Sequence, residues 1–426
     1  MTVAVVGGGV SGLVAARRLH DSGREVTLFE GADYPGGHTN TIRVETERGA
    51  WNVDTGFIVF NDRNYPNFER LLDQLGVAAQ PTDMSFSVAD EEGGFEWASR
   101  PAGLFAKPAH LVDRRFHRML LDLLRFNREA RALLGSNGRG PSLRQFLADG
   151  GYSDYFIERL IVPQVSAVWS ADPDQLWSFP ASFLAEFFAN HGILALTGRP
   201  RWRTVVGGSR TYVEALIAPM HDRIRLRTPV RRIERHPDRV EIAWDGGSQS
   251  FDEVVLATHS DQALAMLADP SPAEREILGA FPYQRNETVL HTDERMLPRR
   301  RRAWASWNFH LVDEPVGLTT VTYDMNRLQS LSADRQFCVT LNRTEAIDPA
   351  KIIRRIDYDH PVFTRAGMAA QDRHGEISGR NRTHYCGAYW RWGFHEDGVW
   401  SALRACEQLT RGRPELPRAE LLEVAA

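Results

Sequence analysis

Apolar positions change their spacing along the chain, and these changes predict which segments form strands and which form helices. Residues 3–6 make a short apolar run of the kind that forms a buried parallel strand. Residues 10–20 then carry apolar side chains at helical spacing, and residues 25–29 return to a strand pattern. The start of the chain therefore predicts a strand, a tight turn, a helix and a second strand.

Downstream, the pattern alternates between strands and helices. Residues 114–134 place their apolar side chains on one stripe, which predicts a long amphipathic helix in a helical subdomain. Asp348 followed by Pro349 predicts a helix that runs to about residue 356. We expect an antiparallel sheet above a substrate pocket from strands at 286–291, 303–311, 317–323 and 337–341.

Three glycines follow the first strand in the spacing G-x-G-x-x-G, at Gly7, Gly9 and Gly12. Gly9 lets the backbone approach a pyrophosphate, and Gly12 lets the helix approach the strand. The free N–H groups and the dipole of the helix N-terminus favour a diphosphate there. Glu30 ends the second strand, where a carboxylate accepts both ribose hydroxyls and favours a free 2′-hydroxyl. These residues predict a dinucleotide site.

Composition and charge narrow the class of protein. A net charge of −4 and a pI near 6.4 give no indication of nucleic-acid binding. The three cysteines are far apart and form no C-x-x-C pair, so neither a disulfide framework nor a metal site is predicted. No apolar run reaches the roughly 18 residues that a membrane span needs. We therefore expect a cytoplasmic protein, and its length suits two domains.

The residues after Glu30 indicate which dinucleotide binds. Gly36 and Gly37 form a pair that is followed by His38 and Thr39. A glycine pair at this place resembles the flavin-containing amine oxidase superfamily, which includes phytoene-type desaturases and binds FAD. Arg usually follows the pair in that superfamily, and His38 in its place moves this chain toward the desaturases. The resemblance implies FAD, bound without a covalent link.

Two further segments match the superfamily in the same order along the chain. Asp54 and Gly56 match a D-x-G sequence that passes close to the flavin ring. Gly207 and Gly208 match a second glycine pair. In the superfamily the residue at Val230 offers its backbone to adenine, and Thr258 ends a strand that flanks the dinucleotide.

The last segment, residues 383–409, resembles the third cofactor motif. A strand ending at Gly387 and a helix with Gly398 at its start would direct the helix N-terminus at the flavin pyrimidine edge. His395 takes the position of a tyrosine that stands over the ring, and an imidazole that titrates near neutral pH is a candidate proton acceptor. The alternative is a histidine that packs beside the ring. The candidate walls of the substrate pocket are Tyr389, Trp390 and Trp392.

The resemblance implies an α/β fold in which a Rossmann-like FAD-binding domain is interleaved with an α+β substrate domain of antiparallel sheet and helices. We assign residues 1–60, 201–265 and 375–412 to the FAD-binding domain, 61–200 and 266–374 to the substrate domain, and 413–426 to a flexible tail. The implied cofactor contacts are Gly7, Gly9, Val10, Ser11, Gly12, Glu30, Gly36, Gly37, His38, Thr39, Asp54, Gly56, Val230, Thr258, Gly387, Asp397 and Gly398.

The runs VDTGFIVFNDRNYPNFERLLDQLG and CGAYWRWGFHEDG resemble a bacterial family of predicted NAD/FAD-binding oxidoreductases. Its members accompany cyclopropane-fatty-acid-synthase-like methyltransferases. This resemblance implies a dehydrogenase or desaturase of a methyl-branched or unsaturated fatty acyl chain. A flavin amine oxidase and a non-redox lipid-binding protein are the alternatives. Many amine oxidases hold a lysine near the flavin, whereas the two lysines here, Lys107 and Lys351, lie outside the cofactor segments.

A basic cluster, Arg299 to Arg302, precedes Trp304 and Trp307. Such a cluster can dock on an anionic bilayer, with its charges at the phosphates and its rings at the interface. An ordinary solvated turn is the alternative. An acyl-lipid substrate favours peripheral contact with the inner face of the membrane.

Overall fold

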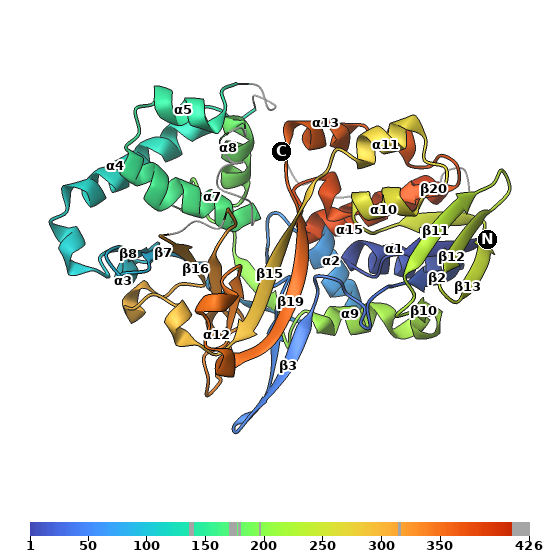
Figure 1. Ribbon diagram of the computed structural model, residues 1–426, viewed down its shortest axis with the longest axis horizontal. Coiled ribbons are helices and arrows are strands. Elements are labelled where there is room, and N and C mark those ends of the chain that lie inside the picture. The colour runs from blue at the N-terminus through green and yellow to red at the C-terminus, as the bar shows by residue number, and fades with distance from the viewer. Residues whose placement is uncertain (136–139, 170–176, 178–179, 196, 314–316, 411–426) are drawn as a thin grey trace.

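The computed structural model describes residues 1–135, 140–169, 177, 180–195, 197–313 and 317–410. A parallel sheet lies at one end of the molecule, long antiparallel strands lie in the middle, and a group of helices lies at the other end (Figure 1). This arrangement confirms the expected α/β fold with an added α+β region. The predicted tail, residues 413–426, falls outside the described residues.

The parallel sheet has the strand order β10-β2-β1-β14-β20. Its strands come from three distant parts of the chain, which are the segments assigned to the FAD-binding domain. Apolar side chains alternate between its faces, so Val3 and Val5 face one cluster while Ala4 and Val6 face another. The strands are β1 (Thr2–Val6), β2 (Glu25–Phe29), β10 (Ile224–Arg225), β14 (Glu253–Leu256) and β20 (Thr383–Tyr385).

Helices cover one face of this sheet and a small antiparallel sheet covers the other. On the first face α1 (Val10–Asp21) packs against α15 (His395–Thr410), with α2 (Pro66–Leu75) and α9 (Arg210–Ile217) beside them. The second face is covered by β11 (Val230–Arg235), β12 (Val240–Trp244) and β13 (Gly247–Phe251). The nearby short helices are α10 (Ser260–Met266), α11 (Pro272–Leu278), α13 (Arg365–Asp372) and α14 (His374–Ile377).

The middle of the molecule is a mixed sheet with the order β19-β15-β18-β17-β16-β7-β8. Its pairs are antiparallel, as predicted, except that β16 and β7 are parallel. The strands are β7 (Phe86–Asp90), β8 (Glu96–Ala98), β15 (Tyr283–His291), β16 (Trp307–Leu311), β17 (Val321–Asp324), β18 (Cys338–Leu341) and β19 (Ile352–Pro361). Smaller pairings join β3 (Thr41–Thr46) to β4 (Gly49–Asp54), and β9 (Trp202–Val205) to β5 (Val59–Asn61) and β6 (Ala79–Pro81).

The prediction of a helix from Pro349 to about residue 356 is wrong. Asp348 does accept a hydrogen bond from the Ala350 N–H at 3.0 Å, but only one turn of 3₁₀-helix forms before β19 begins at Ile352. The strand then pairs with β15 along nearly its whole length (Figure 1). Tertiary pairing therefore overrides the local helix-start signal.

The far end of the molecule contains, within the described residues, the α-helices α4 (Arg114–Arg131), α5 (Leu143–Asp149), α6 (Asp154–Phe156), α7 (Val162–Trp169) and α8 (Ala181–Asn190). Helix α4 is amphipathic as predicted, because Phe116, Met119 and Phe126 are buried on its inner stripe. Two short helices, α3 (Pro101–Leu104) and α12 (Met325–Leu328), lie at the mixed sheet.

Asp54 joins segments that are distant in the sequence. Its buried carboxylate accepts hydrogen bonds from the Thr41 hydroxyl at 2.5 Å and from the Ser209 hydroxyl at 2.7 Å. The Ser209 N–H and the Gln329 amide also donate to it, each at 3.0 Å. Burial raises the pKa of Asp54 to about 6. Asp54 was predicted to lie beside the flavin ring. This is wrong, because its carboxylate is buried and binds groups inside the fold.

We expect Asp54→Ala to lower the free energy of unfolding by about 2–4 kcal/mol, because the buried Ser209 and Gln329 donors lose their acceptor. Urea denaturation of the purified protein measures this. Asp21→Ala is the control, since Asp21 pairs with Arg17 at the surface and its loss costs about 0.5 kcal/mol or less. Equal small losses in the two variants would contradict the role assigned to Asp54.

Candidate active site

A cavity of about 1700 Å³ runs from the glycine-rich turn after β1 to the helical end of the molecule. At the first end it is lined by Gly7, Gly8, Gly9 and Glu30. At the other end it passes between the mixed sheet and the helices. There its lining includes Leu104, Leu120, Leu123, Leu124, Asn127, Leu160, Gln164, Ala167, Val168 and Phe187.

The turn after β1 is built by close backbone contacts. A Cβ atom at Gly12 would lie 1.8 Å from the Gly7 carbonyl oxygen, so a side chain there is excluded. A Cβ atom at Gly9 would meet nothing within 4 Å, because this position faces the open cavity. The Glu30 carboxylate accepts the Gly8 N–H at 2.6 Å. This turn therefore leaves room for a diphosphate at the start of α1, with an acid beside it for a ribose.

Two other predicted segments close onto this turn. The Gly36 N–H donates to the Gly8 carbonyl at 2.7 Å, and a Cβ atom at Gly37 would lie 3.2 Å from the Gly9 Cα. On the other side, a Cβ atom at Gly398 would lie 2.7 Å from the Val10 side chain. The glycine pair and the last helix are thus held against the dinucleotide turn.

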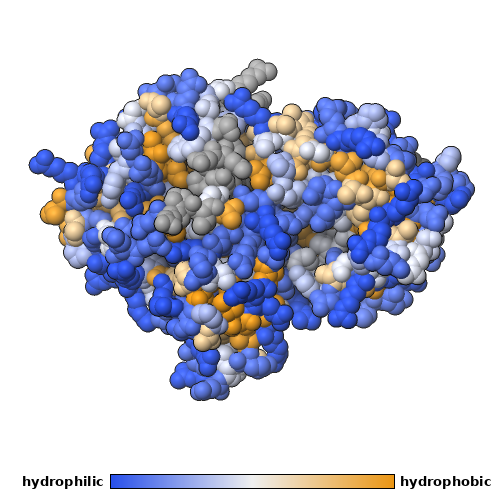
Figure 2. Space-filling view, viewed as in Figure 1, coloured by the Kyte–Doolittle hydropathy of each residue, from blue (hydrophilic) through white to orange (hydrophobic). Residues whose placement is uncertain are grey.

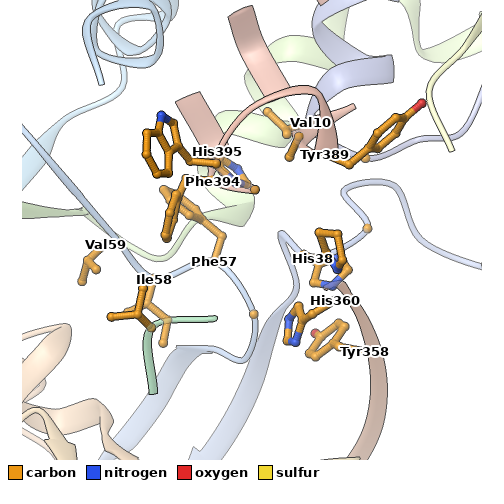
Figure 3. A pocket seen from close by; sticks show the side chains of 18 of the residues that line it. Val10, His38, Phe57, Ile58, Val59, Tyr358, His360, Tyr389, Phe394 and His395 are labelled. Carbon is orange, nitrogen blue, oxygen red and sulfur yellow. The ribbon is translucent and has the colours of Figure 1, made fainter. Parts of the chain in front are cut away.

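A group of histidines and a tyrosine lines the middle of the cavity. The ring of His38 lies 4.7 Å from that of Tyr358 and 5.3 Å from that of His360 (Figure 3). The His259 ring lies 6.4 Å from that of His38. The His38 Nε2 atom is buried and has no hydrogen-bond partner among the described residues. Burial lowers the pKa of His360 to about 4 and holds the pKa of His38 well below its usual value. These imidazoles are therefore neutral at neutral pH.

His395 lies across the cavity from this group, beside Phe394 (Figure 3). Its ring stacks on Phe57 with the centroids 3.5 Å apart. Its Nε2 atom lies 2.5 Å from the Tyr212 hydroxyl and 3.2 Å from the Thr39 hydroxyl. Burial lowers the pKa of His395 to about 3, so the expected titration near neutral pH is corrected. Its geometry is that of a neutral ring held in a fixed orientation.

Most residues predicted for the site line the cavity, and six do not. Trp390 packs in the core against Phe281 and His374, which corrects its expected place in the pocket wall. Asp397 is buried and accepts the Phe394 N–H at 2.8 Å, which fixes the start of α15 instead of facing the cavity. The other four, Gly12, Thr39, Asp54 and Gly398, are not among the residues that line the cavity. The lining includes Gly7, Gly9, Val10, Ser11, Glu30, Gly36, Gly37, His38, Gly56, Val230, Thr258, Gly387, Tyr389, Trp392 and His395.

Sequence reasoning missed the residues that β19 brings to the site. Tyr358 and His360 are two positions apart on this strand, so their side chains share one face. The alternation of DYDHP was present in the sequence, but a helix up to about residue 356, and no strand, was predicted over this segment. Phe57 was also missed, although it directly follows Gly56 in the segment expected near the flavin.

Comparison with known proteins identifies the family. The model of the flavin containing amine oxidoreductase family matches residues 10–317. The chain therefore belongs to this family. The open dinucleotide turn, the acid at Glu30 and the start of α15 fit FAD, which confirms the expected cofactor.

AofH of Mycobacterium tuberculosis, a protein assigned as a flavin-containing monoamine oxidase, is 25% identical over 298 residues. The match covers 66% of this chain and 63% of AofH, so the chain spans less than two thirds of that relative. Carotenoid phi-ring synthase of Streptomyces griseus is 27% identical over 63% of this chain and 54% of its own length. The structure of a CLA-producing fatty acid isomerase from P. acnes has a TM-score of 0.67 at 16% identity, covering 97% of this chain and 98% of that chain.

We expect FAD to be released completely when the purified protein is precipitated with acid. The three cysteines are buried and none of them lines the cavity, so no thiol lies where it could bond to the flavin. The visible spectrum of the supernatant and of the redissolved pellet measures the release. Yellow colour that stays with the pellet would contradict non-covalent binding.

Proposed function

We propose that the protein is a dehydrogenase or desaturase of a long apolar substrate, of the class of a methyl-branched or unsaturated fatty acyl chain. The observation that carries the proposal is the continuity of the cavity. The cavity joins the turn that fits FAD to its other end, between the mixed sheet and the helices, where leucine, valine and phenylalanine side chains line it. We call this second end the chamber. A chain seated in the chamber would have one segment beside the flavin.

The chamber suits a long hydrocarbon better than a small polar molecule. The lining supplied by α4 and α7 consists of Leu120, Leu123, Leu124, Asn127, Gln164, Ala167 and Val168, which carry no charge. Each buried methylene contributes about 0.8 kcal/mol, so an extended chain gains affinity along its length. A small amine would leave most of this surface uncovered.

The side chains near the turn suit a reaction at carbon. When bound, the flavin would supply the acceptor for a hydride from one carbon of the substrate, and a proton lost from the neighbouring carbon to water would complete the double bond. Burial keeps His38, His360 and His395 uncharged, so they place no cation beside a hydrocarbon. Phe57 and Phe394 add apolar surface next to His395 (Figure 3).

A flavin amine oxidase is the second candidate, because the family and AofH favour it. The lysines do not support it. Lys107 donates to the Gly94 carbonyl and Lys351 pairs with Asp293, and neither lysine lines the cavity. The names of two similar proteins, a carotenoid ring synthase and a fatty acid isomerase, favour an apolar substrate.

We expect methyl-branched or unsaturated acyl lipids to bleach the bound flavin under anaerobic conditions, and simple amines to bleach it much more slowly. Stopped-flow absorbance measures both rates. Leu123→Arg, which places a charge in the chamber, should slow bleaching by acyl lipids at least about tenfold. Leu134→Arg is the matched control, since Leu134 is exposed and does not line the cavity. Rapid bleaching by amines alone would establish the amine oxidase, and no bleaching by either class would favour a non-redox binder.

We expect His395→Phe to slow flavin reduction by less than about tenfold and to leave its pH dependence between pH 5.5 and 8 unchanged. The wild-type imidazole has a pKa lowered to about 3, so it is already neutral across this range. The loss in rate would come from the Tyr212 hydroxyl, which loses one of its two partners. A loss of about a hundredfold or more, with an inflection in the wild-type profile that the variant lacks, would instead identify His395 as the base.

A further inference from the structure

The outer face of the helical end carries large apolar side chains that the fold leaves uncovered. On α4, Leu121 is 63% exposed and Leu124 is 54% exposed. Just before the helix, Leu111 is 58% exposed and Val112 is 83% exposed. The His117 ring lies 2.9 Å from the Leu111 carbonyl, which holds this loop beside the turn of α4 that precedes Leu121. We call Leu111, Val112, Leu121 and Leu124 the α4 apolar patch.

The α4 apolar patch continues into the cavity. Leu124 belongs to the patch and also lines the cavity, so it stands at the rim. Leu120 and Leu123 also line the cavity and lie next to Leu124 around the helix. Apolar side chains of α4 therefore run from the exposed patch to the lining of the cavity.

Basic residues border the patch. Residues 107–131 contain seven lysines and arginines against three acidic residues, whereas the whole chain has a net charge of −4. Arg114, Arg118 and Arg128 are exposed on α4 within about two turns of Leu121. Arg118 pairs with Asp122 at 3.2 Å and Arg128 with Glu129 at 3.5 Å, and these two arginine side chains remain 55% and 78% exposed. Figure 2 shows orange apolar residues among blue hydrophilic ones at the end of the molecule where Figure 1 places α4.

The arginine cluster expected to meet the membrane is largely used within the fold. Arg299 donates to the backbone carbonyls of Glu91 and Glu92, and Arg300 pairs with the buried Glu96 at 2.6 Å. Arg301 lies over the Trp304 ring, whose N–H donates to the Pro298 carbonyl. The 3₁₀-turn Arg301–Ala303 packs against α3, which lies at the mixed sheet. The arginine cluster therefore belongs to the mixed sheet and not to the helical end of the molecule.

We propose that the α4 apolar patch and its arginines dock the protein on an anionic lipid bilayer, with the cavity mouth at Leu124 facing the acyl chains. The apolar side chains would enter the interface and the arginines would contact lipid phosphates. Docking at this place lets an acyl chain pass from the bilayer to the chamber without crossing water. None of the helices in the described ranges has the length and apolar composition needed to traverse a bilayer.

Charge distinguishes the bilayer from a second copy of this chain. A symmetric dimer through the patch would bring the same arginines of both copies together, and like charges at an interface oppose association. An anionic bilayer supplies the complementary charge over a wide area. Docking on a bilayer is measured without substrate or turnover, so it can hold or fail independently of the proposed function.

The test is flotation of the purified holoenzyme with vesicles of phosphatidylglycerol and phosphatidylcholine, compared with vesicles of phosphatidylcholine alone. We expect binding to the anionic vesicles that weakens as salt is added. Val112→Ser with Leu121→Ser should lower the partition coefficient at least about tenfold, because both side chains would lie at the interface. Arg114→Gln with Arg128→Gln should lower it by a similar factor through lost contacts with anionic lipid.

Matched controls lie on another face. Val206→Ser with Ile353→Ser removes two exposed apolar side chains, and Arg354→Gln with Arg355→Gln removes two exposed arginines of β19. Both control proteins should float as the wild type does, and thermal melts confirm that every variant folds. Equal binding by patch and control variants would overturn the proposal. So would a patch variant that converts a dimer into a monomer while its vesicle binding stays at the wild-type level.

Discussion

Close backbone contact at the turn after β1 is the constraint on which the rest of the structure depends. Gly12 lets α1 approach the carbonyl of Gly7, and Gly37 and Gly398 let two distant segments reach the same turn. Larger residues at these positions would separate the segments by the width of a side chain. Because the segments meet without side chains between them, the turn keeps an open space at Gly9 where the diphosphate of FAD fits.

The two ends of the cavity differ in polarity, and burial determines the character of each end. Near the glycine turn, burial keeps His38, His360 and His395 neutral, so polar rings line the site without adding charge. Under α4 the walls supplied by α4 and α7 are mostly aliphatic and carry no charge, and their affinity for a ligand grows with the apolar area that it covers. The proposed flavin-dependent reaction on a hydrocarbon chain would use both ends at once. The exposed leucines of α4 extend the second end to the protein surface.

Local motifs predicted the cofactor site better than they predicted its neighbours. The G-x-G-x-x-G turn, Glu30 and the glycine pair carry their function in the backbone or at a strand end, so sequence order alone placed them. Asp54 and Trp390 lie close to such motifs in sequence, but their side chains point into the fold. The direction of a side chain depends on strand register and on the neighbours that the fold supplies. A sequence motif specifies neither the strand register nor these neighbours.

The sequence by itself determined the parallel sheet, the dinucleotide turn and the amphipathic character of α4, because each follows from spacing within one short segment. Only the tertiary structure decided that residues 352–361 form a strand, since their hydrogen bonds come from β15, about 70 residues earlier in the chain. It also decided the state of His395, because a pKa depends on desolvation by residues from several segments. The union of the cofactor turn and the apolar chamber in one cavity likewise required the fold. Residues that line it come from nearly the whole length of the chain, and no local pattern encodes their meeting.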